Sequence, residues 1–338
     1  MTDDFAPFHF EAVPGGPKSP DEMALAGFER SKRELDGEGT RPAIQFLTGM
    51  RPIEVDEGRI VFVMPATSWL ASARGEISTT AASFLADAPL GGAVMTAMPP
   101  RTAIPTVELS LAYVEATASI GEDLYGVGKL ISHDAVTAMA EVEVYGGERL
   151  MARGLTRVMI EPTLVLVPDI DRREPASEAP YRRSLLGEPI TDDVWGSVSG
   201  LDVLMAQVSG ELPLPPIAWL LGLRPTEAAE GVIGGQVIAS GWMASPSGTL
   251  YGGFVAAVLE WAISATAQTL ALPGGRERVL DMKVNYLRPL IPQRQLLSVV
   301  GRLTHRGRRI VVGEAALSRE DGKVIAQAVG TARLEQPS

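Results

Sequence analysis

The stretch SPSGTLYGGFVAAVLEWAISATAQTLAL, residues 245–272, is almost wholly apolar after its first turn and is followed by Pro273. The pattern predicts a glycine turn that leads into a helix apolar on every side, which must be surrounded by protein. Glu260 is the single carboxylate of this helix, and its burial is costly unless it is paired or used in chemistry. The N–H groups of Gly252 and Gly253 lie at the positive end of the predicted helix dipole, which suits a developing oxyanion.

The region around this stretch is repeated in the chain. RPAIQFLTGMRPIEVDEGRIVFVMP (residues 41–65) resembles LPPIAWLLGLRPTEAAEGVIGGQVIAS (residues 214–240), and Gly49 matches Gly222 at an offset of 173 residues (222 − 49). Trp69 matches Trp242 at the same offset, and weaker matches continue downstream. We interpret the pattern as an internal duplication, which takes priority over local predictions.

The repeat divides the chain into four predicted segments: an N-terminal arm (1–19), a first domain (20–160), a linker (161–192) and a second domain (193–338). The linker is predicted from its charged and proline-containing sequence. Each domain is expected to contain a short helix, a strand and turn, the long apolar helix, and three or four strands with alternating apolar residues. One long helix wrapped by an antiparallel sheet is an α+β architecture.

Composition excludes several classes of protein. Hydrophobic residues make up 46% and charged residues 21% of the 338, and the net charge of −11 argues against nucleic-acid or anionic-membrane partners. The chain has no cysteine, which excludes disulfides and a thiol nucleophile, and its three histidines are too scattered to predict a metal site. The acidic N-terminus lacks a signal-peptide core, and Glu260 interrupts the only run that suggests a membrane span. We therefore expect a cytoplasmic protein.

The second repeat carries the motif of a known family. GTLYGG (residues 248–253), Glu260 seven residues after the second glycine, the strand DMKVNYLRP (281–289) and the segments HRGRRIVVGEAAL and GKVIAQAVGTARL together resemble the PaaI-like hotdog acyl-CoA thioesterases. The loop of that family usually reads N-x-x-G-x-x-H-G-G. The resemblance implies a double hotdog: two tandem repeats, each with a long central helix wrapped by an antiparallel sheet, that form a pseudo-dimer.

The resemblance implies hydrolysis of an acyl-CoA thioester. Glu260 would act as general base or nucleophile, and the amides of Gly252 and Gly253 would form the oxyanion hole. Helical spacing places Ser264 one turn after Glu260 on the same face, where it could bind a water or the carboxylate. Coenzyme A would enter as part of the substrate, with no other cofactor and no metal. The resemblance also leaves room for a homodimer of pseudo-dimers.

Two departures from the family motif support a rival interpretation. Ser245 stands at the family asparagine position, and Tyr251, which could donate to a carbonyl or merely fill space, stands at the family histidine position. The rival is a non-catalytic protein that binds acyl-CoA or a hydrophobic ligand, with Glu260 as a paired structural acid and the glycines as a plain turn. A dehydratase is disfavoured because the sequence places no Asp–His pair.

The first repeat is predicted to hold a degenerate site. When Gly75 is aligned with Gly252, the turn is about four residues shorter, Arg74 takes the position of Tyr251, and Ser83 takes the position of Glu260. Asp87 then lies one helical turn beyond Ser83.

Sites of the family are built across the dimer interface. The resemblance therefore implies that Glu260 faces the turn at Arg74 and Gly75, while the turn at residues 252–253 faces Ser83 and Asp87. The best turn and the best carboxylate would then lie in two unequal sites.

A basic cluster, HRGRR at residues 305–309, stands out in this acidic chain. Arg306 and Arg308 could bind the phosphates of coenzyme A. The alternative is a solvated hairpin tip.

Overall fold

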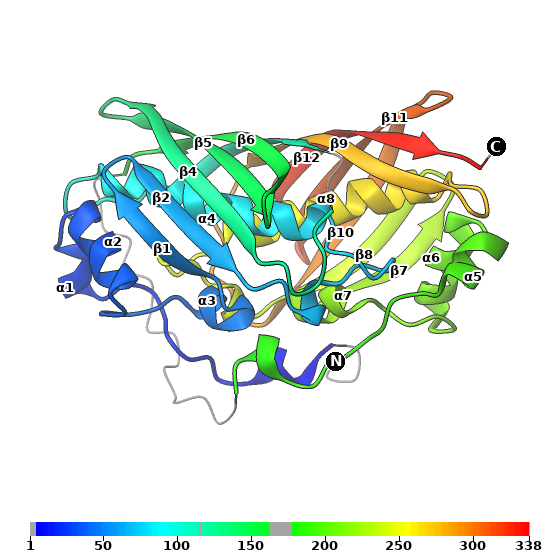
Figure 1. Cartoon of the computed structure of the whole chain (residues 1–338), viewed down its shortest axis with the longest axis horizontal. Coiled ribbons are helices and arrows are strands. Elements are labelled where there is room, and N and C mark those ends of the chain that lie inside the picture. Colours follow the sequence, from blue (N-terminus) through cyan, green and yellow to red (C-terminus); the bar gives the residue numbers. More distant parts are fainter. Residues whose placement is uncertain (1–4, 115–116, 162–177, 338) are drawn as a thin grey trace.

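A single antiparallel sheet of twelve strands curves around two long helices (Figure 1). The computed structural model describes residues 5–114, 117–161 and 178–337. The strand order is β1-β2-β4-β5-β6-β3-β9-β12-β11-β10-β8-β7, so the first six and the last six strands form the two halves of the sheet. The predicted α+β double hotdog, with a long helix in each half, is confirmed.

The elements of the two halves follow the same order. The first half contains β1 (Arg51–Asp56), β2 (Arg59–Met64), α4 (Thr79–Thr96), β3 (Thr106–Tyr113), β4 (Leu124–His133), β5 (Thr137–Gly146) and β6 (Arg149–Met159). The second contains β7 (Leu223–Ala229), β8 (Val232–Ala239), α8 (Gly252–Gln268), β9 (Arg276–Tyr286), β10 (Gln295–Arg306), β11 (Ile310–Arg319) and β12 (Val324–Glu335).

Shorter helices lie outside these two sets of elements. They are η1 (Pro7–Phe10), α1 (Pro20–Met23), α2 (Gly27–Leu35), α3 (Ala43–Thr48), η2 (Ser68–Leu70), η3 (Pro180–Arg182), α5 (Asp192–Ser197), α6 (Gly200–Ser209), α7 (Pro216–Leu221) and η4 (Gly241–Met243). Helix α2 packs against β1, and α6 packs against β7. Figure 1 shows α1 and α2 beside the β1–β2 hairpin.

The two halves are related by a pseudo-two-fold axis through the centre of the sheet. Ser110 of β3 lies opposite Lys283 of β9, and these residues are separated by the repeat offset of 173 (283 − 110). The two central strands therefore present equivalent positions to each other, as an isologous contact requires. The apolar helices α4 and α8 pack against each other beneath this junction (Figure 1).

The N-terminal arm is packed against both halves. The Phe8 ring contacts Trp69 of the first half edge to face, at 5.9 Å between centroids, and the Phe8 carbonyl accepts a hydrogen bond of 2.7 Å from Trp242 Nε1 of the second half. The arm at residues 5–19 is thus part of the folded structure. Much of the predicted linker, residues 162–177, lies outside the described residues.

No helix in the described part of the chain combines the length and the hydropathy needed to cross a membrane.

Candidate functional site

Two related sites form where each long helix begins. The start of α8 at Gly252 lies against Asp87 of α4, and the start of α4 at Thr79 lies against Glu260 of α8. The two helix starts are one repeat offset apart (252 − 79 = 173), and so are the two carboxylates (260 − 87 = 173), so the two sites correspond to each other. We name them the Asp87 site and the Glu260 site. Each contains a carboxylate from one repeat and a helix start from the other, so Glu260 does not share a site with Gly252 and Gly253.

The predicted alignment of the first repeat was wrong. Gly75 and Gly248 both have a φ of 80°, a conformation that glycine adopts at little cost, and they are 173 residues apart. Gly75 therefore corresponds to the turn glycine Gly248, not to Gly252. The first turn is not shorter, and Asp87 rather than Ser83 stands at the position of Glu260.

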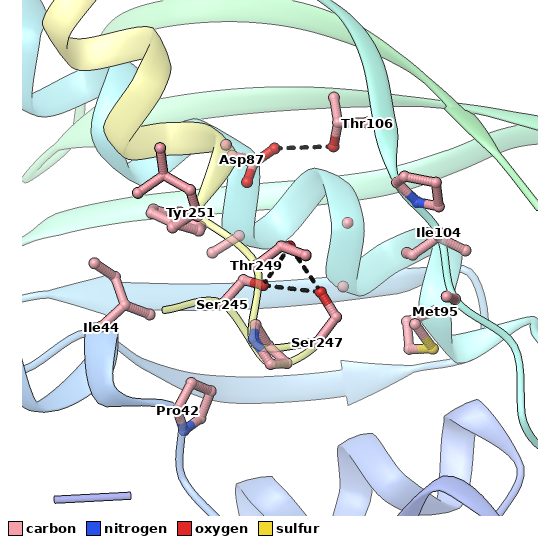
Figure 2. Close-up of a pocket in the computed structure, with 18 of the residues that line it drawn as sticks. Pro42, Ile44, Asp87, Met95, Ile104, Thr106, Ser245, Ser247, Thr249 and Tyr251 are labelled. Carbon is pink, nitrogen blue, oxygen red and sulfur yellow. Dashed lines mark hydrogen bonds between the residues drawn. The ribbon is translucent and has the colours of Figure 1, made fainter. Parts of the chain in front are cut away.

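In the Asp87 site, a carboxylate caps the start of α8. The Asp87 carboxylate lies against the backbone N–H groups of Gly253 and Gly252, which favour its charged form. It accepts a 3.4 Å hydrogen bond from Thr106 Oγ1 (Figure 2). A Cβ atom on Gly252 would lie 2.8 Å from Asp87 Oδ2. Glycine at this position therefore lets the carboxylate approach the helix start closely.

The surroundings of Asp87 suit a general base. Burial raises the pKa of Asp87 from 3.8 to about 6, although the hydrogen bonds from Gly253, Thr106 and Gly252 oppose the shift. A carboxylate with a pKa near the working pH accepts a proton more readily than an ordinary surface aspartate does.

A cavity of about 380 Å³ extends from Asp87. Its wall is mainly apolar, and Figure 2 shows Ile44, Met95 and Ile104 around it, with Asp87 on one side. The size and the apolar lining match a site for a small organic group. Ser247 and Leu287 are exposed lining residues and mark its opening.

Ser245 and Tyr251, at the family asparagine and histidine positions, line this cavity but are bonded elsewhere. The Ser245 hydroxyl bonds Ser247 Oγ at 2.9 Å and Thr249 Oγ1 at 3.2 Å within the turn (Figure 2). Tyr251 is buried and donates its hydroxyl proton to the carbonyl of Phe84 at 2.9 Å. The suggestion that Tyr251 donates to a substrate carbonyl is therefore wrong, and its ring fills space.

The Glu260 site is smaller and more polar. Glu260 is 0% exposed and accepts hydrogen bonds of 2.6 Å from Thr79 Oγ1 and from Thr80 Oγ1. Burial raises its pKa from 4.5 to about 7; the two threonine bonds lower it, and the charge of Glu277 raises it further. The neighbouring cavity measures about 130 Å³ and is lined by Thr79 and Thr80 but not by Glu260 itself.

Three other predicted site residues have structural partners near the Glu260 site. Ser264 donates to Glu277 Oε1 at 3.3 Å and not to Glu260, which corrects the predicted role of Ser264. Ser83 is fully buried and donates to the carbonyl of Thr79 at 2.7 Å. Arg74 lines the smaller cavity, and its guanidinium lies over the Trp195 ring at 3.9 Å.

Arg306 and Arg308 lie away from both cavities. They are exposed at the tip of the β10–β11 hairpin, where Arg306 Nη1 pairs with Glu230 Oε1 at 2.5 Å. Neither residue lines the Asp87 cavity or the Glu260 cavity. The solvated-hairpin alternative therefore describes this cluster, and the predicted contact with coenzyme A phosphates lacks support.

Sequence reasoning missed the paired threonines and the position of Asp87. The signal for both was present, because the offset of 173 carries Gly252, Gly253 and Glu260 onto Thr79, Thr80 and Asp87. Within residues 5–114, 117–161 and 178–337, no three His, Asp or Glu side chains are grouped to hold a metal ion.

Comparisons with known proteins agree with this architecture. Residues 247–326 match the family model of the thioesterase superfamily. A search of curated proteins finds no match. The confirmed resemblance is thus to hotdog thioesterases as a superfamily, and the PaaI subtype stays a prediction.

Solved structures match over both halves of the chain. A conserved protein with a hot dog fold from Alicyclobacillus acidocaldarius matches with 14% identity and a TM-score of 0.54, covering 88% of this chain and 100% of its own. The TesB protein of Mycobacterium avium subsp. paratuberculosis matches with 10% identity and a TM-score of 0.53, covering 88% and 98%. The acyl-CoA thioesterase II TesB2 of Mycobacterium marinum matches with 11% identity and a TM-score of 0.51, covering 88% and 98%. These matches show that the chain has the double hotdog fold.

Proposed function

We propose that this protein is an acyl-CoA thioesterase and that the reaction takes place in the Asp87 site. The observation that carries the proposal is the placement of a buried carboxylate of raised pKa against two helix-start N–H groups, beside a cavity of about 380 Å³. The thioesterase-superfamily match to residues 247–326, which include those N–H groups, supports the same reaction class.

The geometry supports a hydrolysis with general-base catalysis. The thioester carbonyl would replace a carboxylate oxygen of Asp87 as the acceptor of the Gly252 and Gly253 N–H groups. The freed carboxylate would take a proton from water while the water oxygen attacks the carbonyl carbon. The N–H groups would stabilise the tetrahedral oxyanion. Cleavage of the C–S bond would then release the acid, and the thiolate would receive the proton.

The Glu260 site fits this reaction less well. Two side-chain hydroxyls hold Glu260, and threonines rather than glycines begin the facing helix. Its cavity is about a third of the size (130 against 380 Å³). The catalytic role first expected for Glu260 is therefore assigned in this proposal to its counterpart Asp87.

The matched variants Asp87→Asn and Glu260→Gln test the proposal. Hydrolysis of a panel of acyl-CoAs can be followed with a thiol reagent. We expect Asp87→Asn to lower kcat by about 100-fold or more, because loss of a general base typically costs that much. Glu260→Gln should change kcat by less than about 3-fold, well below that general-base effect.

The reverse pattern would move the reaction to the Glu260 site and refute the assignment of Asp87. A different result would support the rival class. If the wild type hydrolyses no acyl-CoA but its melting temperature rises with added acyl-CoA, the protein is a binding protein and not a thioesterase.

A further inference from the structure

A buried arginine lines the same cavity as Asp87. Arg30 of α2 is 5% exposed, and its Nη1 and Nη2 atoms donate to the Sδ atoms of Met23 and Met95. A thioether sulfur is a weak acceptor, and buried charges are normally paired with carboxylates. The guanidinium therefore has only weak partners for these two donor groups.

The nearest carboxylates are bound by other groups. Glu22 accepts from the N–H groups of Ser19 and Thr40, at 2.8 and 2.7 Å. Glu34 binds Lys18 Nζ at 2.7 Å and accepts from Gln45 Nε2. Their charges partly offset the effect of burial, which lowers the pKa of Arg30. Among the described residues, however, no carboxylate forms an ion pair with Arg30.

One face of α4 connects Asp87 with Arg30. Asp87, Gly91 and Met95 are spaced four residues apart, so they lie on the same face of the helix, and all three line the cavity. A Cβ atom on Gly91 would have no neighbour within 4 Å, so the cavity is open at this point. Met95, which contacts Arg30, lies eight residues after Asp87 (95 − 87), or about 12 Å along the helix axis.

We propose that the acyl group of the substrate carries an oxygen acceptor at its far end and that Arg30 binds this oxygen. The inference rests on the proposed thioesterase function, with the thioester at Asp87 and the chain along α4. The apolar wall would contact the methylene groups, and the guanidinium would bind the terminal carboxylate or hydroxyl. An extended chain advances by about 1.2 Å per bond, so the span fits an acyl group of roughly eight to ten carbons.

Matched acyl-CoAs of eight and ten carbons test this inference. Each length is supplied with a methyl, an ω-hydroxyl or an ω-carboxyl end. We expect kcat/KM of the wild type to be about 10-fold higher or more for an oxygen-ended substrate than for its methyl-ended counterpart, as a charge-assisted hydrogen bond provides. The comparison of the hydroxyl with the carboxyl end then shows whether the bound oxygen is neutral or charged.

The substitution Arg30→Met should reduce the preference to a ratio near one. Methionine is flexible and would join two methionines already present, and a melting curve checks that the variant folds. Arg30→Lys keeps the charge and should retain part of the preference for the carboxyl end. Arg33→Met, on the exposed part of the same helix, is the control and should leave every ratio unchanged.

Equal kcat/KM for all three ends in the wild type would overturn the inference and leave the proposed thioesterase function standing. If no substrate is hydrolysed, that function fails, and binding still decides the question. Calorimetry with S-alkyl-CoA thioethers, which have no thioester to hydrolyse, should show at least 10-fold tighter binding of oxygen-ended chains in the wild type, but not in Arg30→Met. Equal binding of methyl-ended and oxygen-ended thioethers by the wild type would overturn the inference.

Discussion

Asp87 and Glu260 occupy equivalent positions in the two repeats but bind different donors. Asp87 lies against the backbone N–H groups of Gly252 and Gly253, which a substrate carbonyl can also use. Glu260 accepts from two threonine hydroxyls. Burial raises the pKa of both carboxylates. The chemistry of each site therefore depends on the facing helix start as much as on the carboxylate.

The raised pKa of Glu260 predicts a pH-dependent stability. The folded protein binds the Glu260 proton more tightly than the unfolded chain, because the folded pKa is about 7 and the ordinary value is 4.5. This contribution to the free energy of unfolding is fully present below pH 4.5 and is lost as the pH rises to about 7. Glutamine does not titrate. Glu260→Gln should therefore gain stability relative to the wild type across this window, by up to about 3 kcal/mol.

Urea unfolding at pH 4.5, 6 and 8 measures this difference. The exposed carboxylate Glu320, in the turn between β11 and β12, provides the control through the variant Glu320→Gln. The prediction would be contradicted if the unfolding free energy of Glu260→Gln, relative to that of the wild type, decreased as the pH rises.

At the scale of elements, the start of α8 is shaped by two different close approaches. A Cβ atom on Gly252 would lie 2.8 Å from a carboxylate oxygen of Asp87, which belongs to a side chain that can move. A Cβ atom on Gly253 would lie 2.2 Å from the backbone carbonyl of Phe84, which is fixed in α4. Gly252 is therefore required for the geometry of the Asp87 site, and Gly253 is required for the packing of α8 on α4.

Alanine substitutions should separate these two roles. We expect Gly252→Ala to displace Asp87 and lower kcat by roughly 10-fold or more, with a change in unfolding free energy below about 1 kcal/mol. Gly253→Ala should force the helices apart and lower the unfolding free energy by about 1–3 kcal/mol. Thioesterase assays and urea unfolding of both variants provide the comparison. Equal destabilisation by the two substitutions would refute the distinction.

The turns that precede α4 and α8 show why part of the site was predictable from the sequence and part was not. A backbone φ of 80° at Gly75 and Gly248 requires glycine, so these two positions keep the repeat in register. At the start of α8, Gly252 and Gly253 are under no such backbone constraint, and the corresponding residues of the first repeat are Thr79 and Thr80. The sequence alignment paired Gly75 with Gly252 instead of Gly248, and it therefore matched Ser83 rather than Asp87 with Glu260. The offset of 173 between Gly49 and Gly222 was sufficient to give the correct match.

For the whole molecule, the repeat and the family motif were sufficient to predict the double hotdog. The packing of α2 against β1 and α4 was not predictable, because the charged sequence of α2 is typical of a solvated helix. Arg30 lies in the cavity only because α2 packs beside Met95 of α4. The sizes of the two cavities likewise depend on side-chain packing that the sequence pattern does not encode.

The central junction predicts that neither half is stable alone. Separation would expose the paired edges of β3 and β9 and the contact of α4 with α8. An unpaired edge and an apolar helix face both promote association. We expect residues 1–161 and 178–338 to aggregate or self-associate when expressed singly and to form a 1:1 complex when coexpressed. Size-exclusion chromatography with light scattering tests this, and two folded monomeric halves would contradict it.

The crossed construction of the two sites constrains how such a gene can change. Asp87 is encoded in the first repeat and the Gly252–Gly253 helix start in the second, so loss of either repeat removes half of both centres. Substitution at the two helix starts, in contrast, alters one centre at a time. Substitutions at Thr79 and Thr80 can therefore inactivate the Glu260 site while the Asp87 site is preserved. This is possible only if both repeats are encoded in one chain.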